Sequence, residues 1–204
     1  TSMSHAVTSA EVLRGAGYFT AMTGKWHLKQ QPTDFGFDRY FGHLSGACNF
    51  FKGDSTFRLN GQSWKVPDSD FYTTVADVDF ALDFLGEARQ SSKPFYLYVA
   101  FNAPHAPLVA PEEYTKRFLR LGYDQGTAGR YGMIENIDDN FGHMMELLEE
   151  WKMLEDTLVI FMTDNGATHL GGQLGGESVR HFNANLRGGK NSPNEGGTHV
   201  PAFW

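Results

Sequence analysis

The chain has 204 residues, of which 41% are hydrophobic and 20% are charged, so it can form one sizeable core and has an ordinary globular composition. Its net charge of -7, from 17 basic and 24 acidic residues, comes without a cluster of Lys and Arg, which argues against a nucleic-acid binder. The single cysteine, Cys48, excludes an internal disulfide, and no apolar run is long enough to span a membrane.

The first third of the chain predicts one helix and one strand before a long loop. A helix is expected over residues 8–16, because Thr8 and Glu11 have the spacing of a capping box. A short strand is expected over residues 18–22. Residues 29–70 are rich in Gly, Asp, Phe and Ser, which predicts an irregular loop with a small hairpin at its Asn-Gly pair.

The rest of the chain alternates helices with apolar runs. Helices are predicted over residues 74–88, 111–121 and 128–151, and strands buried on both faces over residues 95–101 and 157–163. The apolar face of the longest helix is expected to consist of Ile134, Ile137, Phe141, Met144, Leu148 and Trp151. This alternation predicts an α/β fold in which a mostly parallel sheet is sandwiched between helices.

Polar residues follow each of the three expected strands. Lys25 and His27 follow the first, His105 follows the second, and Asp164 and Asn165 follow the third. Ligands of open α/β sheets bind beyond the carboxyl ends of the strands, so these side chains are the candidates for chemistry.

Each candidate has a functional and a structural interpretation. Asp164 and Asn165 offer two hard oxygen ligands for Ca²⁺ or Mg²⁺, or they form a strand-ending turn. His105 lies between Pro104 and Pro107, which stiffen its loop; it either protonates a leaving group or is a loop histidine bonded to backbone.

Two further segments have the same ambiguity. In residues 24–28, Lys25 and His27 suit an anionic oxygen and a proton transfer, or they are a surface lysine and its neighbour beside a core Trp26. The glycine-rich segment 186–197 either brings Lys190 to an anion or is a flexible linker. Taken together, the candidates describe a site for a tetrahedral oxyanion, as sulfate or phosphate transfer requires.

Four blocks in this order resemble the sulfatases of the alkaline phosphatase superfamily. They are Ala16-Gly17-Tyr18 through Gly24-Lys25-Trp26-His27-Leu28, Ala103-Pro104-His105-Ala106-Pro107, Thr163-Asp164-Asn165-Gly166, and Leu186-Arg187-Gly188-Gly189-Lys190 through Glu195-Gly196-Gly197. The resemblance covers residues 1–204 and implies an alkaline phosphatase-like fold, as an internal part of the catalytic domain without its nucleophile-bearing N-terminal part and its C-terminal subdomain.

The resemblance implies a role for each matched side chain. Lys25 and Lys190 are similar to the lysines that hold sulfate oxygens. His105 resembles the group that assists departure of the alcohol, and His27 the base that later helps release sulfate. Ser45 is a weaker match to a polar residue near the nucleophile. The substrate expected from the resemblance is a small-molecule or carbohydrate sulfate ester.

The metal and the nucleophile are matched only in part. Asp164 and Asn165 resemble half of the family's Ca²⁺ site, and His169, just after them, has no assigned role. The family's nucleophile is a formylglycine made in a C/S-x-P-x-R motif, which these 204 residues do not contain; Cys48 is followed by Asn-Phe-Phe-Lys. We therefore expect no sulfatase turnover from this chain alone. The alternatives are a phosphonate or phosphate monoester hydrolase of the same superfamily and a non-catalytic remnant.

Overall fold

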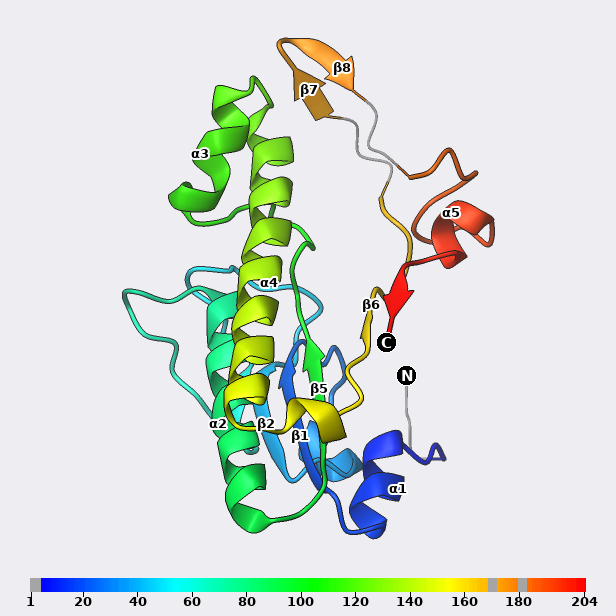
Figure 1. The fold of residues 1–204 in the computed structure, drawn as a ribbon. Coiled ribbons are helices and arrows are strands. Elements are labelled where there is room, and N and C mark those ends of the chain that lie inside the picture. The colour runs from blue at the N-terminus through cyan, green and yellow to red at the C-terminus, as the bar shows by residue number, and fades with distance from the viewer. Residues whose placement is uncertain (1–4, 169–171, 180–182) are drawn as a thin grey trace.

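The computed structural model describes residues 5–168, 172–179 and 183–204. Its centre is a five-stranded sheet in the order β4-β3-β2-β1-β5, in which β2, β1 and β5 run parallel (Figure 1). The strands are β1 Phe19–Gly24, β2 Arg39–His43, β3 Phe57–Leu59, β4 Gln62–Ser63 and β5 Phe95–Ala100. The α/β class with a mostly parallel sheet is thus confirmed.

Helices cover both faces of this sheet. Helix α1, Ser9–Gly15, packs Ala10 against Met22, whereas α2, Thr73–Ser91, packs Phe84 against the neighbouring Ala21. Successive residues of a strand point to opposite faces, so the two helices lie on opposite sides. Helix α4, Gln125–Glu150, packs on α2, and α3, Glu112–Arg120, packs on α4 (Figure 1).

The remaining elements are short. Two 3₁₀ turns, η1 Pro32–Phe35 and η2 Leu154–Asp156, join longer segments. Strand β6, Phe161–Met162, pairs antiparallel with β9, Ala202–Phe203, and β7, Gly172–Leu174, forms a hairpin with β8, Glu177–Val179; α5 is Glu195–Thr198. Within the described ranges, no helix combines the length and the apolar character needed to cross a bilayer.

The predicted capping box at the start of α1 is present. The backbone N–H of Glu11 donates to Thr8 Oγ1 at 3.1 Å, and the backbone N–H of Thr8 donates to Glu11 Oε2 at 2.8 Å. The Thr8 hydroxyl donates in turn to the Phe35 carbonyl at 2.6 Å, so the cap also ties α1 to η1. Such caps are typically worth about 1 kcal/mol.

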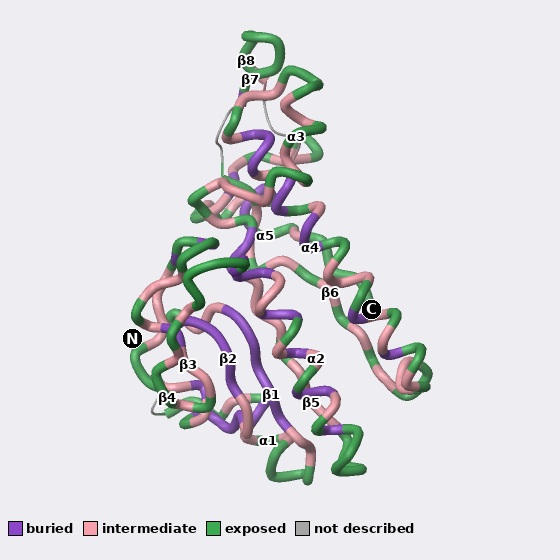
Figure 2. Tube along the Cα trace, turned by 90° about the vertical axis from the view of Figure 1, so that its left-hand side faces the viewer, coloured by how far each residue is buried: buried purple, intermediate pink, exposed green. Residues whose placement is uncertain are grey.

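The core lies mainly between α2 and strands β1 to β3. Phe41 is fully buried and stacks on Phe80, with ring centroids 3.8 Å apart, and meets the rings of Phe57 and Trp64. Figure 2 shows this concentration of buried residues on β1 and β2, whereas the β6 segment is intermediate or exposed. The sheet is therefore firmly packed on the β2 side.

Strand β2 was not predicted, because residues 29–70 were expected to be a loop with one hairpin. The hairpin does form, between β3 and β4 at Asn60-Gly61. Strand β2 depends on long-range pairing with β1, and its Gly42 has φ +145°, where a Cβ would overlap the carbonyl oxygen of Gly24. Such a close strand approach leaves no local signal beyond the glycine.

The two strands predicted to be buried on both faces are not. Among the described residues, strand β5 pairs with β1 alone, and its Tyr98 is 47% exposed. Residues 157–163 form a strand only at Phe161–Met162, which pairs antiparallel with β9, and Leu158 is 74% exposed. An apolar run predicts a strand's burial only if neighbouring strands cover it.

The buried face of α4 also differs from the prediction at one position. Ile134 is 47% exposed, although Ile137, Met144 and Leu148 are buried as expected. The buried stripe instead passes through Gly129, whose Cβ would overlap the carbonyl oxygen of Leu108, so the helix approaches a neighbouring backbone there. Apolar periodicity misses a face that is built on glycine.

Candidate active site

The two parallel strands β1 and β5 bring the first candidate residues to one sheet edge. Gly24 is in register with Ala100 at the carboxyl ends of these strands. Lys25 and His27 follow the first strand, and His105 lies five residues beyond the second. The loops that carry these three side chains therefore leave the sheet at the same end.

The start of the Lys25 loop is fixed by backbone contacts. Gly24 has φ +96°, and a Cβ there would overlap the carbonyl oxygen of Ala100. The N–H of Lys25 donates to that same Ala100 oxygen at 2.9 Å, and the Tyr40 hydroxyl donates to the Gly24 carbonyl at 3.0 Å. Only glycine fits at this turn, and the turn sets the direction in which Lys25 leaves the sheet.

The next residues of the loop are held in the core at Trp26, and the backbone bends at His27. Trp26 packs against Phe35 and Phe37, so it contributes to the core as predicted, and its backbone N–H donates to the His43 carbonyl at 3.0 Å. The loop bends at His27, which has φ +63°. A left-handed residue other than glycine costs about 1–2 kcal/mol and is held by its surroundings.

A second backbone junction brings the Asp-Asn-Gly turn and the glycine-rich segment together. The N–H of Lys190 donates to the Ala167 carbonyl at 2.9 Å, and the N–H of Gly166 donates to the Gly197 carbonyl at 3.0 Å. A Cβ on Gly166 would overlap the carbonyl oxygen of Gly196. The described part of this segment, residues 183–197, is therefore packed against the turn and is not a free linker.

Electrostatic shifts connect these two junctions. Burial lowers the pKa of Lys25, the positive charge of Lys190 lowers it further, and Asp164 opposes both. Burial raises the pKa of Tyr98, and the charge of Asp164 adds to the rise. Two ammonium groups and a carboxylate from distant parts of the sequence thus lie within range of one another at the sheet edge.

Asp164 and Asn165 have the kind of oxygen ligands that a metal ion such as Ca²⁺ prefers, but two residues are too few to form a complete site. The Asn165 side-chain N–H donates to the Gly166 carbonyl at 3.1 Å, which leaves the amide oxygen as the ligating atom. Ca²⁺ prefers such hard oxygens and takes six to eight of them. In the ranges that the structure covers, no three His, Cys, Asp or Glu residues are arranged around one metal position. These two residues would supply part of a site.

His105 satisfies the structural interpretation given above without excluding the functional one. Its Nδ1 lies 2.9 Å from the Ala106 carbonyl, and its backbone N–H donates to Asn102 at 2.9 Å. A carbonyl only accepts, so Nδ1 carries a proton and Nε2 is the atom that can exchange one. The hydrogen bonds and ion pairs of the described residues do not join His105 to Lys25 or Lys190. His169 lies outside the described residues.

Ser45 belongs to a polar network that the sequence did not reveal. Its hydroxyl donates to Asp54 Oδ2 at 2.6 Å and lies 2.9 Å from His43 Nδ1. His43 is fully buried at the end of β2, in the field of both Lys25 and His27. Because β2 was not predicted, His43 and Asp54 gave no signal as site residues; the His-x-Ser spacing is the only local trace.

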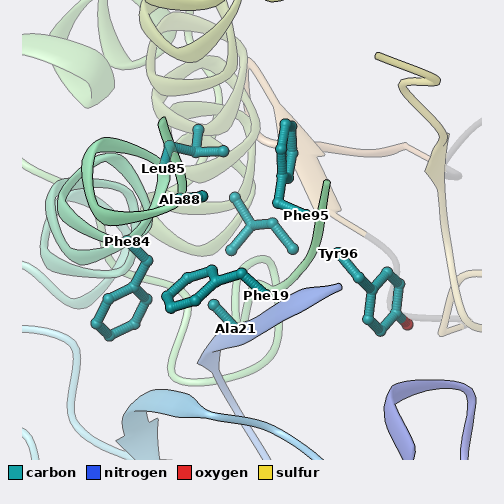
Figure 3. A pocket seen from close by; sticks show the side chains of 8 residues that line it. Phe19, Ala21, Phe84, Leu85, Ala88, Phe95 and Tyr96 are labelled. Carbon is teal, nitrogen blue, oxygen red and sulfur yellow. The ribbon is translucent and has the colours of Figure 1, made fainter. Parts of the chain in front are cut away.

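A separate apolar hollow lies at the other end of the strands. Figure 3 shows it between α2, β1 and β5, lined by apolar side chains that include Phe19, Phe84, Leu85 and Phe95. Phe19 and Phe95 are the first residues of their strands, so the hollow is remote from Lys25 and His105. Of its lining residues only Tyr96 has a polar side-chain group, a hydroxyl 3.1 Å from Ser9 Oγ, so the hollow is a packing gap beside α2 and no candidate for anion chemistry.

Comparisons with known proteins identify the family of this chain. The sulfatase family model matches residues 2–204. The chain belongs to the sulfatase family. It is 34% identical to the pig N-acetylgalactosamine-6-sulfatase and 32% identical to the human one, covering 95% of this chain in both cases. It is 28% identical to an arylsulfatase of Klebsiella aerogenes over 78% of the chain.

Solved structures give the same result for the fold. The structure of Ps i-CgsB in complex with k-i-k-neocarrahexaose matches 95% of this chain and 46% of its own, with a TM-score of 0.81 and 30% identity. A putative sulfatase from Bacteroides fragilis matches 79% of this chain with a TM-score of 0.65 at 19% identity, which speaks for the fold alone. The chain spans 38% of the length of the N-acetylgalactosamine-6-sulfatases.

Proposed function

We propose that this chain is the sulfate-binding part of a sulfatase catalytic domain that hydrolyses sulfate esters. The observation that carries the proposal is the placing of Lys25 and Lys190 in each other's field by independent backbone contacts. Like charges in each other's field repel, and an anion bound between them would offset that repulsion. A sulfate group has the charge and the tetrahedral oxygens for this position.

We assign a different role in sulfate-ester hydrolysis to each side chain around the proposed anion position. Lys25 and Lys190 would hold the non-bridging sulfate oxygens and stabilise the charge that develops on them. His105, with Nδ1 bonded to Ala106, would pass a proton from Nε2 to the leaving alcohol oxygen. His27, on the other side of the Lys25 loop, would act as the base that helps release sulfate.

A divalent cation would complete the charge balance. Asp164 and Asn165 would provide two oxygen ligands for Ca²⁺, or for Mg²⁺, and the cation would neutralise sulfate oxygens. The nucleophile of the family, a formylglycine, has no C/S-x-P-x-R motif among these 204 residues. For that reason the proposal gives this chain a binding role and no turnover of its own.

The proposed substrate is a carbohydrate sulfate ester. Two kinds of relatives support this class: enzymes named for N-acetylgalactosamine-6-sulfate, and a structure that holds a neocarrahexaose. Both are relatives of at least 30% identity over 95% of the chain. The sugar itself is left open by the described side chains.

Sulfate binding is the direct test. Titration of the purified chain with inorganic sulfate, followed by NMR, should show saturable binding that Lys25→Ala and Lys190→Ala each weaken about tenfold or more. Lys93→Ala, at the opposite end of β5, is the matched control and should leave the affinity unchanged. Equal affinities in all four proteins would overturn the proposal.

Turnover and selectivity are measured on the same protein. We expect no release of 4-nitrophenol from 4-nitrophenyl sulfate with Ca²⁺ present, and weak Ca²⁺ binding by calorimetry, because two ligands do not make a full site. Tight Ca²⁺ binding or metal-dependent turnover would contradict the partial site. Stronger binding of 4-nitrophenyl phosphate than of the sulfate would favour the phosphate-ester alternative.

A further inference from the structure

The ring of His27 rests on the backbone of the loop that follows β2. A Cβ on Gly46 would lie 2.5 Å from Nε2 of His27 and 2.9 Å from Cε1, so the imidazole occupies the space over this glycine. His27 also has the left-handed backbone noted above, with φ +63°. The position of the His27 ring therefore depends on the backbone segment Ser45–Gly46, which we call the wall of the His27 ring.

Asp54 fixes that wall. Its carboxylate accepts from the Ser45 hydroxyl at 2.6 Å, from the Thr56 backbone N–H at 2.7 Å and from the Thr56 hydroxyl at 2.6 Å. Thr56 Oγ1 in turn accepts the backbone N–H groups of Leu44 and Ser45, each at 3.2 Å. Burial raises the pKa of Asp54, but the hydrogen bonds from Ser45 and Thr56 outweigh it and lower the pKa overall.

The network also fixes the protons of His43. The Ser45 hydroxyl has one proton, and the short bond to a carboxylate is the stronger place for it. Ser45 must then accept from Nδ1 of His43, which leaves Nε2 as an unprotonated acceptor. Burial lowers the pKa of His43 to about 4, and the charges of Lys25 and His27 add to this against Asp54, so the ring is neutral near pH 7.

His43 is placed to act on the Lys25 loop in two ways. Its backbone carbonyl accepts the Trp26 N–H, the residue between Lys25 and His27. Its Nε2 is fully buried and has no hydrogen-bond partner in the part of the chain that the structure describes. A buried acceptor of this kind is completed by a donor such as a water or an ammonium group.

We infer that Asp54 and His43, acting through Ser45, are positioning residues that set the orientation of His27 and the Lys25 loop. The inference rests on the proposed function only where it concerns sulfate; the placement of His27 stands on the contacts alone. Among the described residues, neither Asp54 nor His43 forms a hydrogen bond or ion pair with the side chains of Lys25, His27 or Lys190, so we assign both a positioning role.

The test uses the whole chain labelled with ¹⁵N and ¹³C in its histidines. In Asp54→Asn, the ring signals of His27 should shift and the Nδ1-protonated pattern of His43 should be lost. Ser55→Ala, an exposed neighbour of Asp54, is the control and should leave both unchanged. Gly46→Ala should shift only the His27 signals, since the added methyl group meets the end of that side chain.

Sulfate titration then distinguishes positioning from general damage. Asp54→Asn should weaken sulfate binding about fivefold in the parent chain and by a smaller factor in a His27→Ala background, because the placement of His27 is then already lost and only the effect through the Lys25 loop remains. Additive losses, or unchanged His27 signals in Asp54→Asn and Gly46→Ala, would overturn the inference. If the parent chain binds no sulfate, the proposed function fails, and the histidine signals still decide the positioning.

Should Asp54→Asn fail to fold, Ser45→Ala takes its place in both measurements. It removes the hydroxyl that joins Asp54 to His43 and leaves the Asp54–Thr56 contacts intact. A melting temperature close to that of the parent, with shifted His27 signals, supports positioning; a lowered melting temperature with unshifted signals refutes it.

Discussion

The candidate site has two halves, the Lys25 loop and the Asp164 turn, and they are packed against the rest of the protein to very different extents. The Lys25 loop stands on fully buried Tyr40, Phe41 and His43, with aromatic rings packed behind it. The Asp164 turn follows a two-residue strand, in a segment whose Leu158 is 74% exposed and Ile160 57% exposed. The first half is therefore held by its own core, whereas the second is held by glycine backbone contacts. The anion site is preorganised only if both halves are held in place, so we expect the less firmly packed half to determine how well the site is preorganised.

The largest expected difference between the halves is in stability. Phe41→Ala should lower the free energy of unfolding by about 3–5 kcal/mol, because it leaves a cavity among Phe57, Trp64 and Phe80. Ile160→Ala should change it by no more than about 0.5 kcal/mol, since that side chain is mostly in solvent. Urea unfolding of both variants measures the contrast, and similar losses would show that the second half is packed as firmly as the first.

The firmly packed half contains a buried carboxyl without a partner among the described residues, that of Asp77 in α2. Neither of its carboxylate oxygens has a hydrogen-bond partner among the described residues, and burial raises the pKa of this carboxyl well above its usual value. The folded state then favours the protonated form, so the contribution of this group to stability is fully present below its unfolded pKa and is lost as the pH rises through the raised folded pKa.

Replacing Asp77 with asparagine should remove that pH dependence. We expect Asp77→Asn to be more stable than the parent by about 1–3 kcal/mol at pH 7 and no more stable below about pH 4. Thermal unfolding across this pH range is the measurement. A variant less stable than the parent at pH 7 would mean that the carboxylate is ionised and paired in solution.

The backbone junction of the second half should be sensitive to a single methyl group. Gly166→Ala would place a Cβ on the Gly196 carbonyl and separate the Asp164 turn from Lys190. Sulfate affinity should fall about tenfold, ~1.4 kcal/mol, with little change in unfolding.

Gly142→Ala is the matched control for that change. Gly142 lies in α4 with no atom near its missing Cβ, so alanine should stabilise the helix by about 0.5–1 kcal/mol and leave sulfate binding unchanged. Equal sulfate affinities for the two glycine variants would show that the junction does not position Lys190.

The smallest expected effect is at the cap of α1, which covers the far face of the firm half. Thr8→Ala removes the acceptor for the Glu11 N–H and the donor to the Phe35 carbonyl, and should cost about 1 kcal/mol of unfolding free energy. Thr8→Ser keeps the hydroxyl and should lose much less. The cap lies away from the anion, so neither variant should alter sulfate affinity.

Much of the fold was predictable from local patterns, and most errors share one cause. The helices α1 to α4 appear where capping signals and apolar spacing indicated them, because those signals lie within a few residues. Strand β2 was missed, and the burial of β5 and β6 was overestimated, because pairing with a distant strand determines both. Ile134 was misplaced for a related reason: the buried face of α4 includes Gly129 and Gly132 beside Met133 and Ile137, and apolar spacing alone does not register glycines.

The same distinction between local and long-range information applies to the candidate site. The sequence by itself determined which residue types are present: Lys25, His27, His105 and the Asp164-Asn165 pair follow predicted strands, and Lys190 stands in a glycine-rich block. Only the tertiary structure decided which of them share a field, that His27 lies on Gly46, and that Asp54 and His43 support it. The reason is physical. A motif is defined by residues that are neighbours along the chain, whereas the electrostatic interactions of a charge, the burial of a carboxylate and the contacts of a glycine depend on residues that are distant in sequence and meet only in the folded protein.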